Sequence, residues 1–337
     1  MPASKWSLKA DAQAILDLAS AFYGSAILFA ASDLGLFSEI SRMRSVTAQG
    51  ISAGLGLDPK STLLFLDACV ALGLLDKDGE NYRNSPQAET YLVPGSAFDI
   101  STFVRENREA YPAWSRLTDF IRSGKPEPPH VSPELDSTTA AVLAMHARAL
   151  SIGRSVVRRL DLGWRRKLLD VGGGSGTYSA MIALEFPQVH CTVLDRPEVV
   201  KIAAALLAQQ GASKHVDTLE GDYHTTPFPE GNDAVLFFGV LHAESVDSIL
   251  NLLRRAADSL RPNGLVYVLD TMTDETHTLP VTSALSALHQ ALTTGDGFIF
   301  SYTELKHWME SFGLCDFNVE ALPSPAPYWL AKARKPG

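Results

Sequence analysis

The segment Leu168-Leu169-Asp170-Val171-Gly172-Gly173-Gly174-Ser175-Gly176 reads as an apolar strand that ends in a glycine turn. A helical pattern begins directly afterwards, at Thr177. Glycines at such a junction let the backbone approach a ligand closely, at the carboxyl edge where open α/β sheets bind ligands. The segment therefore predicts a ligand-binding turn after the first strand of a parallel sheet.

Strand and helix patterns alternate from Lys167 onward, which is typical of a parallel sheet with helices on both faces. The expected strands are 167–171, 190–194, 216–220, 234–238 and 264–269, and the expected helices are 177–186, 198–210, 245–260 and 302–311. Segments 316–320 and 328–332 are expected to close the sheet as an antiparallel pair. These patterns predict a Rossmann-like α/β domain over 161–337.

The first 105 residues have a different pattern, mainly short helices. A helix begins at 45–49, a turn at 55–59 leads into a second helix at 60–74, and segments 75–76 and 82–84 flank a stretch with hairpin-turn chemistry. Helix, turn, helix and wing is the order of a winged-helix module. Residues 106–160, with a Pro-rich loop at 125–129, are expected to form a helical linker that contributes to the substrate pocket.

Composition limits the partners of the chain. The net charge of −9 disfavours DNA binding, which requires a basic surface. The second helix of the winged-helix module is nearly all apolar around Asp67, which also disfavours DNA binding. The longest apolar stretch, 18–32, falls short of the roughly 20 residues that span a bilayer, so we expect no membrane segment but a buried helix. Three widely spaced cysteines without metal-ligand spacing suggest reduced thiols in a cytoplasmic protein and no metal site.

The glycine spacing distinguishes between possible ligands. A dinucleotide site needs Gly-x-Gly-x-x-Gly, but the residue three positions after Gly174 is Thr177, so an NAD-dependent oxidoreductase is disfavoured. The spacing present is Asp170, Gly172, Gly174 and Gly176. A carboxylate at the strand end repels a pyrophosphate and suits a ligand with positive charge. The pattern favours S-adenosyl-L-methionine, which carries an ammonium and a sulfonium group.

Acidic residues at the next two strand ends complete this hypothesis. Asp195 can accept both ribose hydroxyls, a role that NAD sites share. Asp222 can accept from the adenine amino group, and Tyr223 can lie against the ring face. An ordinary solvated turn acid remains the alternative for Asp222.

Motifs along nearly the whole chain resemble the plant-type and bacterial small-molecule O-methyltransferases, the group that includes caffeate and acetylserotonin O-methyltransferases. These motifs are Ala30-Ala31-Ser32-Asp33-Leu34-Gly35-Leu36-Phe37, Trp114-Ser115-Arg116-Leu117 with Ser123-Gly124-Lys125-Pro126, the glycine turn, and Arg261-Pro262-Asn263-Gly264. The resemblance implies a class I methyltransferase sheet and a homodimer formed through residues 1–105. It also implies that S-adenosyl-L-homocysteine is the product formed from the cofactor after methyl transfer.

The resemblance also implies a catalytic base. The family places a histidine after the fourth strand, in a His-Asp-Trp setting, and His242 falls on that position with Ala243 and Glu244 following. Of the two acids that flank this histidine in the plant enzymes, the first corresponds to Asp270, whereas Ile299 stands in the register of the second. Asp270 or Glu244 is expected to orient the ring. A helix-capping role for His242 and an ordinary strand-end role for Asp270 remain open.

Four residues are expected to line the acceptor pocket, because they lie in segments that the family uses for that purpose: Met145, Phe120, His289 and Phe298. Core packing is the alternative for each. The leading function is methyl transfer to a hydroxyl of an aromatic or polyketide-like small molecule, with His242 as general base. C- or N-methylation, a non-methylating reaction on the same scaffold (hydroxylation, decarboxylation or pericyclic ring formation) and a DNA-binding or ligand-sensing regulator are the alternatives.

Overall fold

The computed structural model describes residues 12–96, 99–126, 137–294, 298–322 and 328–337. The chain forms two compact units, Met1–Pro112 and Ala113–Gly337. Each unit has a hydrophobic core of its own.

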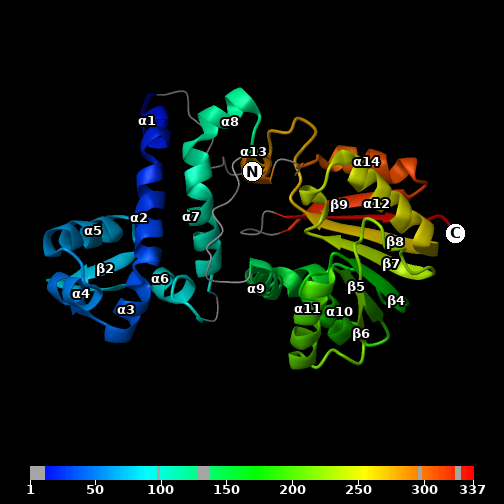
Figure 1. Ribbon diagram of the computed structural model, residues 1–337, viewed down its shortest axis with the longest axis horizontal. Coiled ribbons are helices and arrows are strands. Elements are labelled where there is room, and N and C mark those ends of the chain that lie inside the picture. Colours follow the sequence, from blue (N-terminus) through cyan, green and yellow to red (C-terminus); the bar gives the residue numbers. More distant parts are fainter. Residues whose placement is uncertain (1–11, 97–98, 127–136, 295–297, 323–327) are drawn as a thin grey trace. The chain divides into compact units, whose positions relative to one another are not determined.

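In the first unit, helices pack against a small antiparallel sheet of order β1-β3-β2 (Figure 1). The predicted wing is present as β2 (Leu75–Asp78) and β3 (Asn81–Asn84), and β1 (Val46–Thr47) pairs with β3. The helices are α1 (Ala12–Ser20), α2 (Phe22–Asp33), α3 (Leu36–Met43), α4 (Ala48–Leu55), α5 (Pro59–Ala71) and α6 (Pro86–Tyr91). The winged-helix order expected from the sequence is confirmed.

Local chemistry explains the helix-turn-helix of this unit. Gly56 adopts the left-handed backbone conformation that ends α4, and Asp58 accepts the Ser61 N–H at the start of α5. The acid inside the apolar helix, Asp67, accepts hydrogen bonds from Lys77 and Tyr82 of the wing. Asp67 therefore links helix to wing within the unit.

The first helices carry a large apolar surface. Together α1 and α2 form a helical run, Ala12–Asp33, which among the described residues is long and apolar enough to cross a membrane. The expectation that this segment is too short was wrong, because the helix extends beyond the apolar stretch at 18–32. Ile15 and Leu16 are more than 60% exposed within the chain, so this face is not buried in the unit's own core.

The second unit is built on a seven-stranded sheet of order β6-β5-β4-β7-β8-β10-β9. The strands are β4 (Lys167–Val171), β5 (His190–Asp195), β6 (Val216–Glu220), β7 (Asn232–Phe238), β8 (Leu260–Asp270), β9 (Cys315–Ala321) and β10 (Trp329–Arg334). The first five are parallel, and β10 pairs antiparallel with both β8 and β9. All seven predicted strands are confirmed. The motif at 261–264 lies within β8, as a bulge against β7.

Helices cover both faces of this sheet, as Figure 1 shows. Those that pack against it are α9 (Ser137–Val157), α10 (Thr177–Glu185), α11 (Pro197–Gln209), α12 (Val246–Ser259) and α14 (Tyr302–Ser311). This unit also contains α8 (Leu117–Ser123) and α13 (Val281–Thr294), whereas α7 (Ser101–Ser115) begins in the first unit and ends in the second. Alternate strand residues face opposite cores: Leu169 packs with α12 and α14, whereas Leu168 packs with α9, α10 and α11. The chain order reverses between β4 and β7, which is where open α/β sheets bind ligands.

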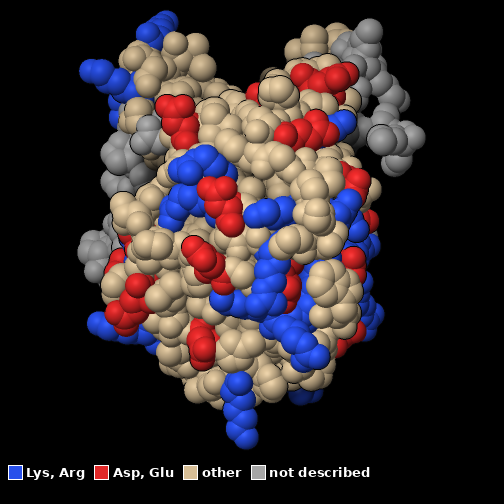
Figure 2. All heavy atoms as spheres, turned by 90° about the vertical axis from the view of Figure 1, so that its right-hand side faces the viewer, with Lys and Arg blue, Asp and Glu red and all other residues tan. Residues whose placement is uncertain are grey.

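Figure 2 shows basic and acidic side chains interspersed on the face that it presents. Ion pairs in the second unit join Arg334 to Asp316, Arg159 to Glu320 and Arg261 to Asp233. Pairing of this kind reduces the positive potential that these arginines present to solvent.

Candidate cofactor and catalytic site

The glycine turn has backbone conformations that residues other than glycine rarely adopt. Gly172, Gly174 and Gly176 have φ values of 64°, 56° and 69°. A Cβ atom on Gly172 would lie 2.8 Å from Cγ2 of Val240, and one on Gly173 would lie 2.7 Å from Cγ of Asp170. Side chains at Gly172 and Gly173 would therefore collide with Val240 and Asp170, so the turn can form only with glycine at these positions.

Asp170 lies beneath this turn and not at its surface. The side chain is 1% exposed, and its Oδ2 accepts a 2.7 Å hydrogen bond from the Ser179 hydroxyl. Its Oδ1 has no partner among the described residues, and burial raises the pKa of Asp170 to about 7. We expected this carboxylate to face a cationic ligand, but Asp170 is not among the residues that line the cavity, and it contacts Ser179 behind the turn. Its role toward the cofactor stays a prediction.

Asp195, at the end of β5, has a carboxylate that lines the cavity. Its Oδ2 accepts the Gly174 N–H at 2.9 Å, and its Oδ1 accepts the Arg196 N–H at 2.8 Å. Burial raises the pKa of Asp195, and the two backbone hydrogen bonds oppose that shift. Asp195 is thereby fixed against the glycine turn with both oxygens oriented.

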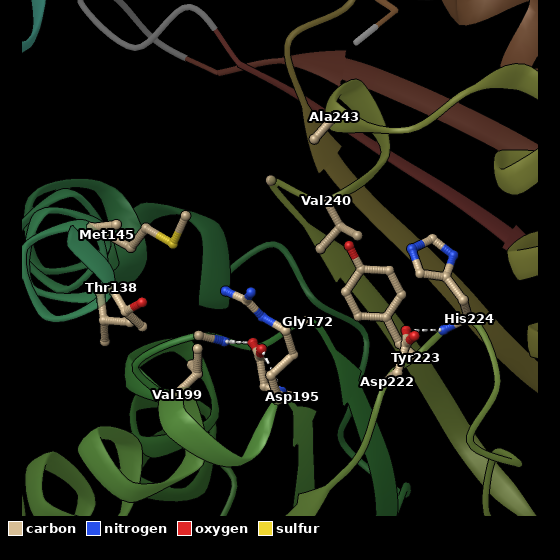
Figure 3. Close-up of a pocket in the computed structure, with 15 residues that line it drawn as sticks. Thr138, Met145, Gly172, Asp195, Val199, Asp222, Tyr223, His224, Val240 and Ala243 are labelled. Atoms are coloured by element: carbon tan, nitrogen blue, oxygen red, sulfur yellow. Dashed lines mark hydrogen bonds between the residues drawn. The ribbon is translucent and has the colours of Figure 1, made fainter. Parts of the chain in front are cut away.

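The residues after β6 form the facing wall. Asp222, Tyr223 and His224 all line the cavity, and Asp222 accepts the His224 N–H at 2.9 Å. The Arg255 guanidinium, on α12, donates to the backbone carbonyls of Tyr223 and His224 and so fixes this loop. Figure 3 shows this wall opposite Met145 and Thr138 of α9, with Asp195 between the two sides.

The cavity encloses about 440 Å³, a volume typical of small-molecule sites. Five segments line it: α9, the glycine turn, the end of β5 with the start of α11, the loop after β6 and the segment after β7. Sequence reasoning placed Gly172, Gly174, Asp195, Asp222 and Tyr223 here, and the structure brings these five together. It missed Thr138, Val142, Val199, His224 and Val240, which carry no motif and reach the cavity only through tertiary packing.

His242 and Asp270 form a hydrogen-bonded pair beside this cavity. His242 lies in the short 3₁₀ helix η1 (Leu241–Ala243), and its Nδ1 is 2.7 Å from Oδ1 of Asp270, which is fully buried at the end of β8. The His242 backbone N–H donates to the other carboxylate oxygen at 3.2 Å. Burial lowers the pKa of His242, but the charge and hydrogen bond of Asp270 outweigh it and raise the pKa above its ordinary value.

This geometry fixes the tautomer of the imidazole. A carboxylate only accepts hydrogen bonds, so Nδ1 carries the proton and Nε2 is left as the basic nitrogen of the neutral ring. Of the two acids considered for orienting the ring, Asp270 does so, whereas Glu244 accepts from Tyr223. Ile299 is 3% exposed and apolar, so the position of the family's second acid supplies no carboxylate.

The four acceptor-pocket residues occupy different settings. Met145 lines the cavity, with its sulfur near Gly174. The Phe298 N–H donates to the His242 carbonyl at 3.0 Å. His289, on α13, accepts the Trp114 indole N–H through Nδ1 at 3.1 Å. Phe120 is half-buried on α8, and neither it, His289 nor Phe298 belongs to the lining of the cavity.

The residues present fit S-adenosyl-L-methionine. The glycine cradle excludes side chains where a nucleoside would approach, Asp195 offers oriented oxygens for hydroxyl donors, and the unpartnered Asp170 Oδ1 beneath the turn can accept a further hydrogen bond. Tyr223 presents an aromatic ring to the same cavity.

Comparison with known proteins agrees with this geometry. Residues 114–313 match the O-methyltransferase domain family, and residues 16–94 match the O-methyltransferase dimerisation domain. Because the first match covers more than half of the chain, this protein belongs to the O-methyltransferase family. It is an S-adenosyl-L-methionine-dependent methyltransferase with a dimerisation domain at its N-terminal end.

Three relatives show how far the similarity extends. The chain is 30% identical to the tetracenomycin polyketide synthesis 8-O-methyl transferase of Streptomyces glaucescens, over 96% of each chain. It is 31% identical to the N,N-dimethyltransferase OxyT of Streptomyces rimosus, over 97% of each. The structure of human N-acetylserotonin methyltransferase in complex with S-adenosylmethionine superposes with a TM-score of 0.82 at 28% identity, covering 98% of this chain and 99% of that one.

Proposed function

We propose that this enzyme methylates a hydroxyl group of an aromatic or polyketide-like small molecule, with His242 as the general base. The observation that carries the proposal is the 2.7 Å contact between His242 and Asp270 beside the cavity. Such a pair is the usual device for removing a proton from a weakly acidic hydroxyl near neutral pH. The relatives from Streptomyces support the acceptor class, since one is a polyketide 8-O-methyl transferase and another a 3-hydroxy-5-methyl-1-naphthoate 3-O-methyltransferase.

Each residue of the cofactor site has a proposed role. Asp195 would accept from the ribose hydroxyls of S-adenosyl-L-methionine, Asp222 would accept from its adenine amino group, and the ring of Tyr223 would contact the adenine face. The glycine turn admits the nucleoside close to the backbone, and Asp170 keeps that turn in place through Ser179. When bound, S-adenosyl-L-methionine supplies an electrophilic methyl group, and S-adenosyl-L-homocysteine remains after transfer.

On the acceptor side, Nε2 of His242 takes the proton of the hydroxyl, and the bonding electrons stay on the acceptor oxygen that gains the methyl group. Asp270 keeps Nδ1 protonated and stabilises the imidazolium that forms. Met145 and Phe298 are proposed to contact the acceptor ring, since one lines the cavity and the other is bonded to the backbone of His242. His289 and Phe120 are proposed for the outer part of the acceptor pocket.

We also propose that the enzyme is a cytoplasmic homodimer. The exposed apolar run Ala12–Asp33 overlaps the dimerisation-domain match at 16–94, so a second copy, and not a lipid bilayer, is the expected cover for this surface. Coverage by protein is consistent with the apolar side chains of α5 that are exposed in the same unit, Leu63 and Leu64.

Methyl transfer to oxygen is tested directly with methyl-labelled cofactor. Incubation of the enzyme with a panel of phenols and matched aromatic amines should place the label in a methyl ether, because His242 is arranged to deprotonate a hydroxyl. Mass spectrometry of the product locates the label. An N-methyl product would transfer the assignment to the amine class to which OxyT belongs. Conversion of an acceptor with the label still on sulfur would replace methyl transfer by a non-methylating reaction.

Asp270→Asn should change the pH dependence of the reaction. In the folded protein the Asp270 carboxylate raises the pKa of His242, so the neutral base is lost as pH falls through this raised value. With asparagine, burial and the charge of Arg148 remain, and both lower the pKa of His242, so the acid limb of the kcat profile should move to lower pH. The plateau should fall by roughly 10²-fold or more, because an amide no longer selects the correct tautomer. A limb that stays in place or moves to higher pH would contradict the pairing.

A further inference from the structure

Glu244 occupies the position where the family's His-Asp-Trp setting has tryptophan, and the methyl-transfer chemistry described above makes no use of it. The side chain is 8% exposed. Its Oε1 accepts a 2.7 Å hydrogen bond from the Tyr223 hydroxyl, and its Oε2 accepts one of the same length from the Ser248 hydroxyl. Oε1 also lies 3.4 Å from Nε2 of His224. A nearly buried carboxylate is thus fully engaged.

These contacts exclude two simpler roles for Glu244. It does not orient His242, because Asp270 holds that ring. It is also not among the residues that line the cavity, where a substrate or cofactor would lie. Ser248, on the first turn of α12, fixes the carboxylate from the other side. The remaining contacts of Glu244 are those with Tyr223 and His224 of the cavity wall.

The two residues that Glu244 contacts on that wall both face the cavity. Tyr223 and His224 line it, with their ring centroids 4.6 Å apart (Figure 3). The Tyr223 ring also limits space at the glycine turn, because a Cβ on Gly172 would lie 3.5 Å from its Cε1. Burial and the hydrogen bond to Glu244 raise the pKa of Tyr223, so its hydroxyl remains a donor. The position of the ring is therefore determined by the carboxylate behind it.

We propose that Glu244 is a positioning residue for the cofactor: it fixes Tyr223 and His224 as the wall against which the adenosyl group packs. This inference rests on the proposed assignment of Tyr223 to the adenine face. It adds that this chain replaces an aromatic side chain of the family pattern by a carboxylate that acts through another residue. Loss of the carboxylate should weaken cofactor binding without removing any atom that contacts the cofactor.

Calorimetric titration of the full chain with S-adenosyl-L-homocysteine tests the proposal. Glu244→Ala should raise Kd by about tenfold or more, the effect of losing a hydrogen bond to a charged group. Glu244→Gln, whose carbonyl still accepts from Tyr223, should stay within about threefold of the wild type. Glu185→Ala, at an exposed position on α10, is the matched control and should leave Kd unchanged. In turnover, the KM for S-adenosyl-L-methionine should rise more than kcat falls.

A double-mutant cycle separates positioning from general destabilisation. Tyr223→Phe removes only the hydroxyl that donates to Glu244. This variant therefore tests the same hydrogen bond even if Glu244→Ala folds poorly. Glu244→Ala should cost about threefold or less in the Tyr223→Phe background, since the hydrogen bond to Tyr223 is the shorter of the two contacts of Glu244 with the wall and only the longer one, to His224, is left. Equal costs in both backgrounds, or no effect of either single change, would overturn the proposal.

Asp195→Ala distinguishes this failure from a failure of the site itself. If Asp195→Ala weakens binding and the changes at Glu244 and Tyr223 do not, the cofactor site stands and the positioning role is refuted. If Asp195→Ala has no effect either, the assignment of this cavity to the cofactor is wrong, and the inference falls with it.

Discussion

His242→Ala is expected to lower kcat by about 10²- to 10⁴-fold, the usual contribution of a general base. The His242 imidazole lies beside the cavity and is oriented by Asp270, whose Oδ1 is 2.7 Å from its Nδ1. Alanine removes this oriented base, whereas the cavity walls keep their side chains because His242 is not among them. Steady-state turnover with labelled cofactor measures the loss.

The matched control is His215→Ala, at an exposed position between α11 and β6. It should turn over like the wild type. Affinity for S-adenosyl-L-homocysteine should stay within a fewfold in His242→Ala, which separates loss of the base from loss of the fold. Turnover within about threefold of the wild type in His242→Ala would remove the base assignment and leave capping of the following helix as the role of this residue.

Asp195→Ala is expected to raise the Kd for S-adenosyl-L-homocysteine by about 10²-fold, because hydrogen bonds to a charged acceptor are each worth about 1.5–3 kcal/mol. The loss has two sources. The ribose hydroxyls lose their acceptor, and the Gly174 N–H loses the carboxylate that holds the turn. Calorimetric titration measures it.

Asp217→Ala is the control for this change, since Asp217 is an exposed aspartate on the neighbouring strand β6. It should bind S-adenosyl-L-homocysteine like the wild type. Wild-type affinity in Asp195→Ala would show that the ribose lies elsewhere and would end the interpretation of this cavity as the cofactor site.

The sheet was predictable because its signals are local. Buried parallel strands read as apolar runs, and the glycine turn after β4 has a spacing that few other sites share. Strand ends of a parallel sheet meet at one edge, so the neighbourhood of Asp195 and Asp222 followed from their positions in the pattern. The pairing of His242 with Asp270 required the family resemblance in addition, because twenty-eight positions separate them.

The remaining features of the site depend on tertiary structure. That Asp170 turns under the loop follows from its bond to Ser179, one turn into α10, and no charge argument from the sequence alone distinguishes this from a carboxylate facing the ligand. The α9 wall, with Thr138 and Val142, carries no motif. The length of the run Ala12–Asp33 was underestimated because helical structure continues through the polar residues that bound its apolar centre.

We propose that one edge of the sheet holds the adenosyl group at Asp195 and presents an acceptor hydroxyl to His242. An experimental structure of the enzyme with S-adenosyl-L-homocysteine and its methyl acceptor measures both at once. We expect ribose hydroxyls hydrogen-bonded to Asp195 and an acceptor oxygen about 2.6–3.2 Å from Nε2 of His242. A nucleoside bound outside this cavity, or an acceptor oxygen directed away from His242, would contradict it.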